Sequence, residues 1–161
     1  ANIVVLTETW LSAKIRDAEL FPFQKRFNVF RHDRELRNGG GVLIGVRDCI
    51  SSFLVDIHST IEIIFVCITI HHQRFILGCC YRPPSCAVDF VDKLHDVLNT
   101  IVTRFPNTPL LLMGDFNYPN IVWGSECPYS DPLSLECTNF LSVVSDFHLS
   151  QLVVKPTRIT A

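Results

Sequence analysis

The chain has 161 residues, with 14 lysines and arginines against 16 aspartates and glutamates, and 48% of its residues are hydrophobic. This length fits one domain with a substantial core, and the composition excludes a disordered chain. The net charge of −2 excludes a strongly basic protein, so any contact with nucleic acid has to come from a local patch. The apolar runs all fall short of the roughly 18 residues of a membrane-spanning helix, and we predict no membrane association.

The seven cysteines do not predict a disulfide framework, because their number is odd and their spacing is irregular. Most of them lie inside apolar runs such as residues 63–67, where a free thiol behaves as a small hydrophobic group. We therefore expect buried thiols in a reducing compartment. The absence of a C-x-x-C pair makes a structural zinc site a poor fit.

The first half of the chain predicts strands. The wholly apolar residues 3–6 indicate a strand with both faces covered, and Glu8 follows it directly. Residues 11–26 are poorly periodic, which indicates a loop with a helical turn. A glycine-rich turn is expected at residues 38–41. Further strands are expected at residues 27–31, 42–46, 61–70 and 74–80. The last two form a hairpin, in which the pair His71-His72 fits a turn better than a metal site.

The second half mixes helices and strands. Residues 87–104 predict an amphipathic helix, because apolar residues recur there at spacings of three and four. A continuous apolar strand follows at 110–113, with Gly114-Asp115-Phe116-Asn117 at its end. Residues 133–147 indicate another helix, and residues 149–154 a final strand. Strands with interspersed helices predict an α/β or α+β sandwich.

Two apolar strands each end in a carboxylate, Glu8 and Asp115. Ligand sites in layered sheets lie beyond strand ends, and two converging carboxylates bind a hard cation such as Mg²⁺. Asn117 adds an amide that can hydrogen-bond phosphate oxygens or orient a water molecule. The alternative is an ordinary turn, because glycine, aspartate and asparagine all suit turns. The spacing alone leaves both interpretations open.

Five short motifs occur in one order along the chain. They are Leu6-Thr7-Glu8-Thr9-Trp10, Gly39-Gly40-Gly41-Val42, Tyr81-Arg82-Pro83-Pro84, Gly114-Asp115-Phe116-Asn117 and Lys155-Pro156-Thr157-Arg158. Together they resemble the endonuclease domain of non-LTR (LINE-type) retrotransposons, particularly CR1/Jockey-type elements, over residues 2–161. That domain belongs to the endonuclease/exonuclease/phosphatase superfamily. The resemblance implies one partial domain over residues 1–161, a four-layered α/β sandwich with two central β-sheets.

The resemblance also implies a reaction, the hydrolysis of a phosphodiester with Mg²⁺ or Mn²⁺. Glu8 matches the family's metal ligand. Asp115 would position or deprotonate the attacking water, and Asn117 would hold that group and stabilise transition-state oxygens. Tyr81 matches a tyrosine that hydrogen-bonds the scissile phosphate.

Two further residues are weaker candidates for substrate binding. Thr157 matches a phosphate-contacting threonine of the family. Arg82, beside Tyr81, could approach phosphate or only pin the loop with the two prolines.

The chain also departs from the family pattern. The family has an asparagine upstream of the glutamate and a later Ser-Asp-His segment, and neither has a match here. Residues 145–148 read Ser-Asp-Phe-His, but the aspartate and histidine are not adjacent and they precede Thr157. We therefore interpret the chain as truncated at both ends and expect it to be weakly active or inactive alone.

The resemblance implies partners and a location as well. It implies DNA as substrate and a reverse transcriptase domain in the same polyprotein. Such an enzyme must reach chromosomal DNA, so we expect it in the nucleus at some stage. Other possible functions are a phosphatase or exonuclease of the same superfamily, because specificity in this fold lies in surface loops, or a non-catalytic remnant that acts as a binding module.

Two surface features remain open. Residues 14–37 hold seven of the 14 basic residues together with four acids, which indicates a solvated face or a contact with the DNA backbone. Trp10 and Trp123 are interpreted as packing residues rather than base-stacking platforms.

Overall fold

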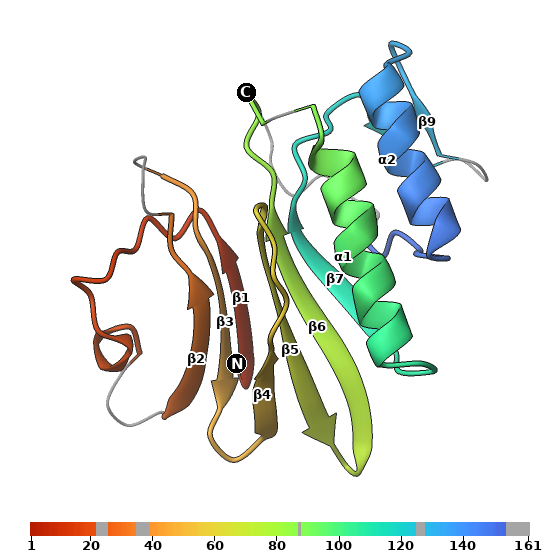
Figure 1. Ribbon diagram of the computed structural model, residues 1–161. Helices are drawn as coiled ribbons and strands as arrows, with labels where there is room; N and C mark the ends of the chain where they lie inside the picture. Colours follow the sequence, from red (N-terminus) through yellow and green to blue (C-terminus); the bar gives the residue numbers. More distant parts are fainter. Residues whose placement is uncertain (22–25, 35–38, 87, 125–127, 154–161) are drawn as a thin grey trace.

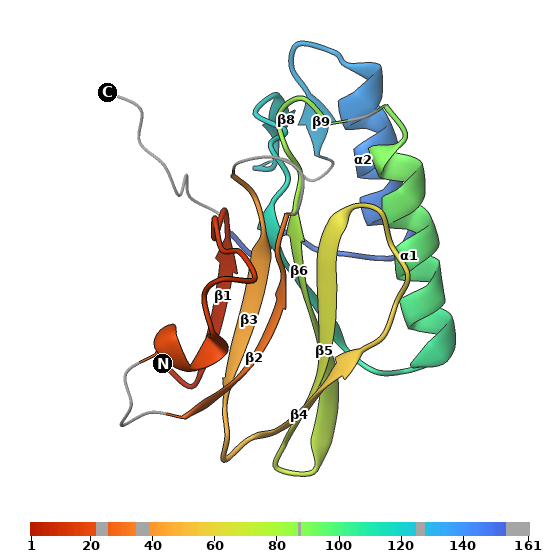
Figure 2. The ribbon, with the colours of Figure 1, turned by 60° about the vertical axis from the view of Figure 1, so that its left-hand side comes forward.

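The computed structural model describes residues 1–21, 26–34, 39–86, 88–124 and 128–153, and the account below concerns these residues. Two β-sheets pack face to face, and two helices cover the outer face of the second sheet (Figures 1 and 2). The predicted α+β sandwich with two central sheets is therefore confirmed. Among the described residues, the only helix beside the first sheet is the short 3-10 helix η1 (Asp17–Glu19). An ion pair of 3.1 Å between Asp17 and Arg31 connects η1 to that sheet.

The first sheet has three antiparallel strands, β1 (Ile3–Thr7), β2 (Phe27–His32) and β3 (Val42–Arg47), in the order β1-β3-β2. The central strand β3 is the most buried of the three. Alternate residues of a strand point to opposite faces, and β3 directs Val42, Ile44 and Val46 toward the second sheet. The strand β1 lies at the edge, which leaves Glu8 at the rim of the sandwich.

The second sheet has the order β4-β5-β6-β7. Its strands are β4 (Ser51–Val55), β5 (Glu62–Ile70), β6 (Gln73–Tyr81) and β7 (Leu110–Asp115). The predicted hairpin is present: His71 and His72 have φ values of 49° and 67° between β5 and β6, as a two-residue turn with two left-handed positions requires. Strands β6 and β7 are parallel, and helix α1 (Phe90–Arg104) connects them.

Two cores flank the second sheet. Ile64, Val66 and Ile68 of β5 face the first sheet, whereas Ile63, Phe65 and Cys67 face α1 and helix α2 (Leu135–Asp146). Because β5 is covered on both faces, its sequence is a continuous apolar run rather than an alternating one. The same double burial makes β6 a rigid support for the residues at its end.

All six described cysteines are free, and four of them are buried: Cys67, Cys79, Cys80 and Cys137. Burial raises the pKa of the Cys79 thiol to about 12. Cys49 is exposed and Cys86 is half-buried, so these two depart from the expectation. Cys127 lies outside the described residues.

The end of the described chain differs from the prediction. Residues 149–153 form no strand, and Leu152 and Val153 are 72% and 54% exposed. An apolar run becomes a strand only where a neighbouring edge takes its hydrogen bonds, and no described strand does so here. The short pair β8 (Ile121–Val122) and β9 (Tyr129–Ser130) and the strand β4 were not predicted. In the described part of the chain, neither helix has the length and hydropathy needed to cross a membrane.

Candidate active site

The C-terminal ends of β1, β6 and β7 meet at one end of the sandwich. Tyr81 ends β6 and lies opposite Asp115, the last residue of β7, in the parallel register. The strand β1 packs against both, and the Tyr81 hydroxyl lies close enough to the Glu8 carboxylate to lower its pKa by hydrogen bonding. The structure therefore brings together Glu8, Tyr81 and Asp115, three candidate residues from distant parts of the sequence, in one row.

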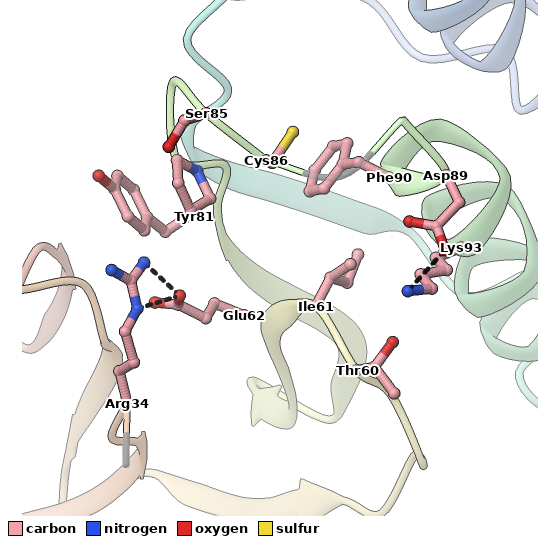
Figure 3. A pocket seen from close by; sticks show the side chains of 11 residues that line it. Arg34, Thr60, Ile61, Glu62, Tyr81, Ser85, Cys86, Asp89, Phe90 and Lys93 are labelled. Carbon is pink, nitrogen blue, oxygen red and sulfur yellow. Dashed lines mark hydrogen bonds and ion pairs between the residues drawn. The ribbon is translucent and has the colours of Figure 1, made fainter. Parts of the chain in front are cut away.

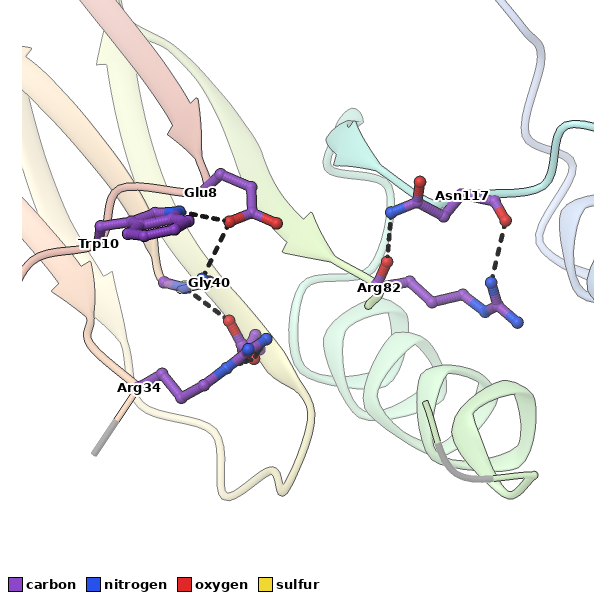
Figure 4. A network of polar contacts seen from close by, with 8 residues as sticks. Glu8, Trp10, Arg34, Gly40, Arg82 and Asn117 are labelled. Carbon is purple, nitrogen blue, oxygen red and sulfur yellow. Dashed lines mark hydrogen bonds and ion pairs between the residues drawn. The ribbon is translucent and has the colours of Figure 1, made fainter. Parts of the chain in front are cut away.

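Two donors hold one oxygen of the Glu8 carboxylate. Its Oε2 accepts hydrogen bonds from the indole Nε1 of Trp10 at 2.7 Å and from the backbone N–H of Gly40 at 3.0 Å (Figure 4). Hydrogen bonding from Tyr81, followed by that from Gly40 and Trp10, lowers the pKa of Glu8, although partial desolvation opposes this shift. Glu8 is thus an exposed carboxylate that stays ionised at neutral pH.

A second carboxylate, Glu62, was missed by sequence reasoning. It begins β5 opposite Tyr81, and its Oε2 accepts a hydrogen bond of 2.6 Å from the backbone N–H of Gly41. Its Oε1 accepts a hydrogen bond of 2.7 Å from Nε of Arg34, which also forms an ion pair with it. The available signal was an acid at the start of an otherwise apolar strand, which needs a cation or backbone donors to be half-buried.

The glycine turn between β2 and β3 therefore holds two carboxylates at once. Successive amides of this turn point to different acids, Gly40 to Glu8 and Gly41 to Glu62. Gly40 and Gly41 have φ values of 71° and 87°, a region that favours glycine. The predicted tight turn is confirmed for residues 39–41 and also positions the site.

A pocket of about 270 Å³ lies beside Tyr81 (Figure 3). Arg34 and Glu62 line it from one side, and Asp89 and Lys93, an ion pair of 2.8 Å, line it from the other. Most of its charged groups are already paired within the protein.

Arg82 is buried, with 4% of its surface exposed. Its guanidinium stacks over the Tyr118 ring at 4.1 Å from the centroid and forms an ion pair with Glu136 of α2. The same group donates to the carbonyl oxygen of Asn117 at 3.0 Å. A direct contact of Arg82 with substrate does not fit this burial, because the guanidinium is almost wholly enclosed and bonds to Asn117 and Glu136. The other predicted role, pinning a loop, fits, although the loop is that of Asn117.

Asn117 is held in turn by the Arg82 backbone. Its Nδ2 donates to the Arg82 carbonyl oxygen at 2.6 Å (Figure 4). Its backbone N–H donates to Oδ1 of Asp115 at 3.0 Å. A carbonyl can only accept, so the nitrogen of the amide must face it. One Nδ2 hydrogen remains for another partner, and the Asp115 carboxylate is exposed. The motif can therefore form a turn and also present polar groups to a substrate.

Gly114 makes the close approach of β6 and β7 possible. Its φ is 146°, and a Cβ at this position would lie 1.8 Å from the carbonyl oxygen of Cys80. Only glycine fits there, so the glycine of this motif has a steric role that places Asp115 beside Tyr81.

The two tryptophans, both predicted to be packing residues, differ in the structure. Trp10 is 70% exposed, so its interpretation as a packing residue is wrong. Trp123 is half-buried and packs against the core under α1 and α2, as expected. Thr157 lies outside the described residues.

The basic stretch is largely paired within the protein. Arg16 pairs with Glu19 at 2.8 Å, Arg31 with Asp17 at 3.1 Å, and Arg34 with Glu62. These pairs favour a solvated, self-paired face over a contact with the DNA backbone for the three arginines. Lys25 and Arg37 lie outside the described residues.

The described residues contain no group of three or more histidine, cysteine, aspartate or glutamate side chains that could hold a metal. Mg²⁺ does not need such a group, because it keeps several waters and binds proteins through one or two carboxylates. The exposed, ionised and firmly positioned carboxylate of Glu8 fits that requirement.

Comparisons with known proteins agree with this fold. A family model described as endonuclease-reverse transcriptase matches residues 75–161. Among solved structures, the endonuclease domain of TRAS1, a telomere-specific non-LTR retrotransposon, matches with a TM-score of 0.65 and 14% identity. The match covers 91% of this chain and 58% of that one, so the chain spans little more than half of its length. None of the curated proteins matches the chain.

Two further structures match less well. The catalytic domain of human Nocturnin with bound sulfate has a TM-score of 0.45 and 16% identity, over 72% of this chain and 51% of that one. A humanized TDP2 of D. rerio has a TM-score of 0.44 and 13% identity, over 94% and 58%. These two likenesses are too weak to carry an argument. The TRAS1 match confirms the predicted fold, an α/β sandwich with two central β-sheets. Because its family model covers more than half of the sequence, the chain belongs to the endonuclease-reverse transcriptase family.

Proposed function

We propose that this chain is the DNA-nicking part of a retrotransposon polyprotein and hydrolyses a phosphodiester with the help of Mg²⁺ or Mn²⁺. The observation that carries the proposal is the row of Glu8, Tyr81 and Asp115 at the ends of three strands, with Asn117 held beside it. The proposal includes a reverse transcriptase domain in the same polyprotein and presence in the nucleus at some stage.

Glu8 would hold the divalent cation. When bound, such an ion neutralises charge on the phosphate oxygens and stabilises the leaving group. The hydrogen bonds from Trp10 and Gly40 hold this carboxylate in place, and together with Tyr81 they lower its pKa and keep it ionised.

Tyr81 would act as a neutral hydrogen-bond donor to the scissile phosphate. Desolvation and the neighbouring Glu8 raise the pKa of its hydroxyl to about 12, so it keeps its proton at every physiological pH. A donor that stays neutral can bind a phosphate oxygen without exchanging protons with it.

Asp115 and Asn117 would handle the attacking water. The Asp115 carboxylate is exposed at the strand end and can accept a proton from that water. Asn117, held on one side by Arg82, can direct its second amide hydrogen to an oxygen of the transition state. We expect weak activity from this chain alone, because active-site groups act as a unit and the chain spans 58% of the TRAS1 chain that it matches.

The test is nicking of supercoiled plasmid with Mg²⁺ and with EDTA, alongside Mn²⁺ binding measured by electron paramagnetic resonance. We expect Mg²⁺-dependent nicking that Asp115→Asn abolishes and Mn²⁺ binding that Glu8→Gln weakens. Asp146→Asn is the matched control, because Asp146 is an exposed acid at the end of α2. Nicking that survives EDTA or Asp115→Asn would overturn the proposal. Mn²⁺ binding without any nicking would favour the non-catalytic remnant instead.

The plasmid also separates the remaining alternatives. A closed circle has no ends, so an exonuclease cannot act on it, and it offers no terminal phosphate to a phosphatase. Activity on linear DNA or on inositol phosphates without nicking of the circle would favour another activity of the same superfamily.

A further inference from the structure

The side chain of Trp10 is exposed beside the proposed metal carboxylate. It follows β1 by three residues and leaves 70% of its surface accessible. A large aromatic ring in this position is unusual, because tryptophan is highly buried on average. Trp123, the second tryptophan of the chain, packs against the core under α1 and α2.

The indole of Trp10 is nevertheless held rigidly. Its Nε1 donates to Oε2 of Glu8 at 2.7 Å (Figure 4). Its backbone N–H donates to the carbonyl oxygen of Gly40 at 2.9 Å. Gly39 lies so close that a Cβ there would be 3.6 Å from Cε2 and Cζ2 of the ring. The ring is thus bound at its polar edge and supported by the glycine turn, while most of its surface stays free.

A rigid, exposed indole is suited to stacking. Every nucleobase offers a flat π-face, and proteins that bind single strands stack such bases on aromatic rings. Trp10 loses little conformational freedom on binding, because its rotamer is already fixed by Glu8. The shared hydrogen bond also places the ring next to the carboxylate that would hold the metal.

We propose that Trp10 is a stacking platform for a nucleobase that has left the DNA stack next to the phosphate to be cut. This inference rests on the proposed function and adds that the DNA is bound with one base unstacked. Because the indole edge is bonded to Glu8, a base stacked on the ring would lie beside the carboxylate that would hold the metal. The site then favours DNA whose bases unstack easily, and single strands over intact duplex.

The test measures binding without catalysis. Trp123→Phe leaves Trp10 as the only tryptophan, and its fluorescence is titrated in EDTA with oligothymidylate, with an abasic oligonucleotide of equal length and with duplex. We expect strong quenching by oligothymidylate, less by duplex and none by the abasic strand. Trp10→Ala is expected to weaken oligothymidylate binding about tenfold, from the usual contribution of one stacked base.

Two variants separate stacking from other roles. Trp10→Phe keeps an aromatic face but loses the hydrogen bond to Glu8, so it should bind oligothymidylate better than Trp10→Ala does. Phe53→Ala removes another exposed aromatic ring, 47% exposed on the edge strand β4, and should leave binding unchanged.

Equal binding by the wild type and Trp10→Ala, or equal quenching by the abasic strand, would overturn the platform. Because the titration needs no hydrolysis, quenching without any plasmid nicking would overturn the proposed activity and leave the platform in place.

Discussion

The two ends of the site row are held in opposite ways. At the Glu8 corner, formed by Glu8, Trp10 and Gly40, an exposed carboxylate is fixed by a neighbouring indole and a backbone amide. At the Asn117 corner, formed by Arg82, Asp115 and Asn117, a buried guanidinium ties the loop to the helical layer. The first corner is exposed to solvent, whereas the second is anchored by a buried side chain, Arg82.

Because of this difference, substitutions at the Asn117 corner should mainly change the free energy of unfolding, and those at the Glu8 corner the pKa of Glu8. A buried charge must be fully paired, so a substitution that breaks the pairing at the Asn117 corner destabilises the whole fold. The Glu8 corner has solvent on one side, which can replace a lost donor. Substitutions there should change the pKa of Glu8 and leave the free energy of unfolding nearly unchanged.

The largest effect is expected at Gly114, beside the Asn117 corner. In Gly114→Ala the new Cβ would lie 1.8 Å from the Cys80 carbonyl oxygen, and the φ of 146° is strained for alanine. Because a backbone atom has to move, β7 would separate from β6. We expect the free energy of unfolding to fall by about 4 kcal/mol or more, measured by urea denaturation.

Gly124→Ala is the matched control for this substitution. A Cβ at Gly124 meets nothing within 4 Å, so it should change the free energy of unfolding by less than about 1 kcal/mol. Equal effects of the two substitutions would mean that the β6–β7 contact does not depend on glycine.

Arg82→Met should have the next largest effect. Methionine fills much of the same volume but leaves the carbonyl oxygen of Asn117 and the Glu136 carboxylate without their donor. We expect a loss of about 3 kcal/mol in the free energy of unfolding.

Glu136→Gln tests the same ion pair from its outer side. The Glu136 side chain is 45% exposed, so water can solvate it, and glutamine still offers an oxygen to Arg82. This variant should therefore lose less of the free energy of unfolding than Arg82→Met does. A larger loss than in Arg82→Met would contradict the assignment of Arg82 as the clamp.

At the Asn117 corner, the sequence indicated Asp115 and Asn117 after an apolar strand but not the contact that holds Asn117. Glu8 and the glycine turn could be identified because each follows or precedes an apolar strand. The fixed position of Asn117 depends on Arg82 reaching Glu136, which is 54 residues away. No local pattern reports such a contact, so Arg82 beside two prolines looked equally like a substrate contact.

The same limit explains the errors in the fold. The double-sided burial of β5 and β6 leaves a clear apolar signal, whereas β4 contains two serines and two exposed apolar residues and was missed. Residues 149–153 carry an apolar signal but form no strand, because pairing is decided by the neighbouring edge. Trp10 was misjudged since residue type alone favours burial, while its exposure is decided by its hydrogen bond to Glu8.

Beside the Glu8 corner, Tyr81→Phe should have the largest effect on the pKa of Glu8. The Tyr81 hydroxyl contributes most to the lowered pKa of Glu8, so its removal should raise that pKa toward the ordinary value. The phenyl ring keeps its packing, and the cost in the free energy of unfolding should be about 1 kcal/mol. Carboxyl carbon chemical shifts in an NMR titration would measure the change.

Glu19 provides an internal control for that titration. Its pKa is lowered by Arg16 in η1, far from Tyr81 in the sequence and in another layer, so it should titrate identically in both proteins. A Glu8 pKa that did not change would show that Tyr81 does not donate to this carboxylate.

Trp10→Phe should change the free energy of unfolding least and gives the sharpest test of the difference between the two corners. The indole N–H contributes less to the lowered pKa of Glu8 than Tyr81 does, so the pKa should rise by less than in Tyr81→Phe. A carboxylate with a lowered pKa stabilises the fold above its unfolded pKa, and this contribution is lost as pH falls through the folded value. The variant should therefore lose slightly less stability on acidification than the wild type. At neutral pH, the free energy of unfolding should change by less than about 0.5 kcal/mol, because Trp10 is 70% exposed. A loss comparable to that of Arg82→Met would mean that the fold depends on the Glu8 corner as much as on the Asn117 corner.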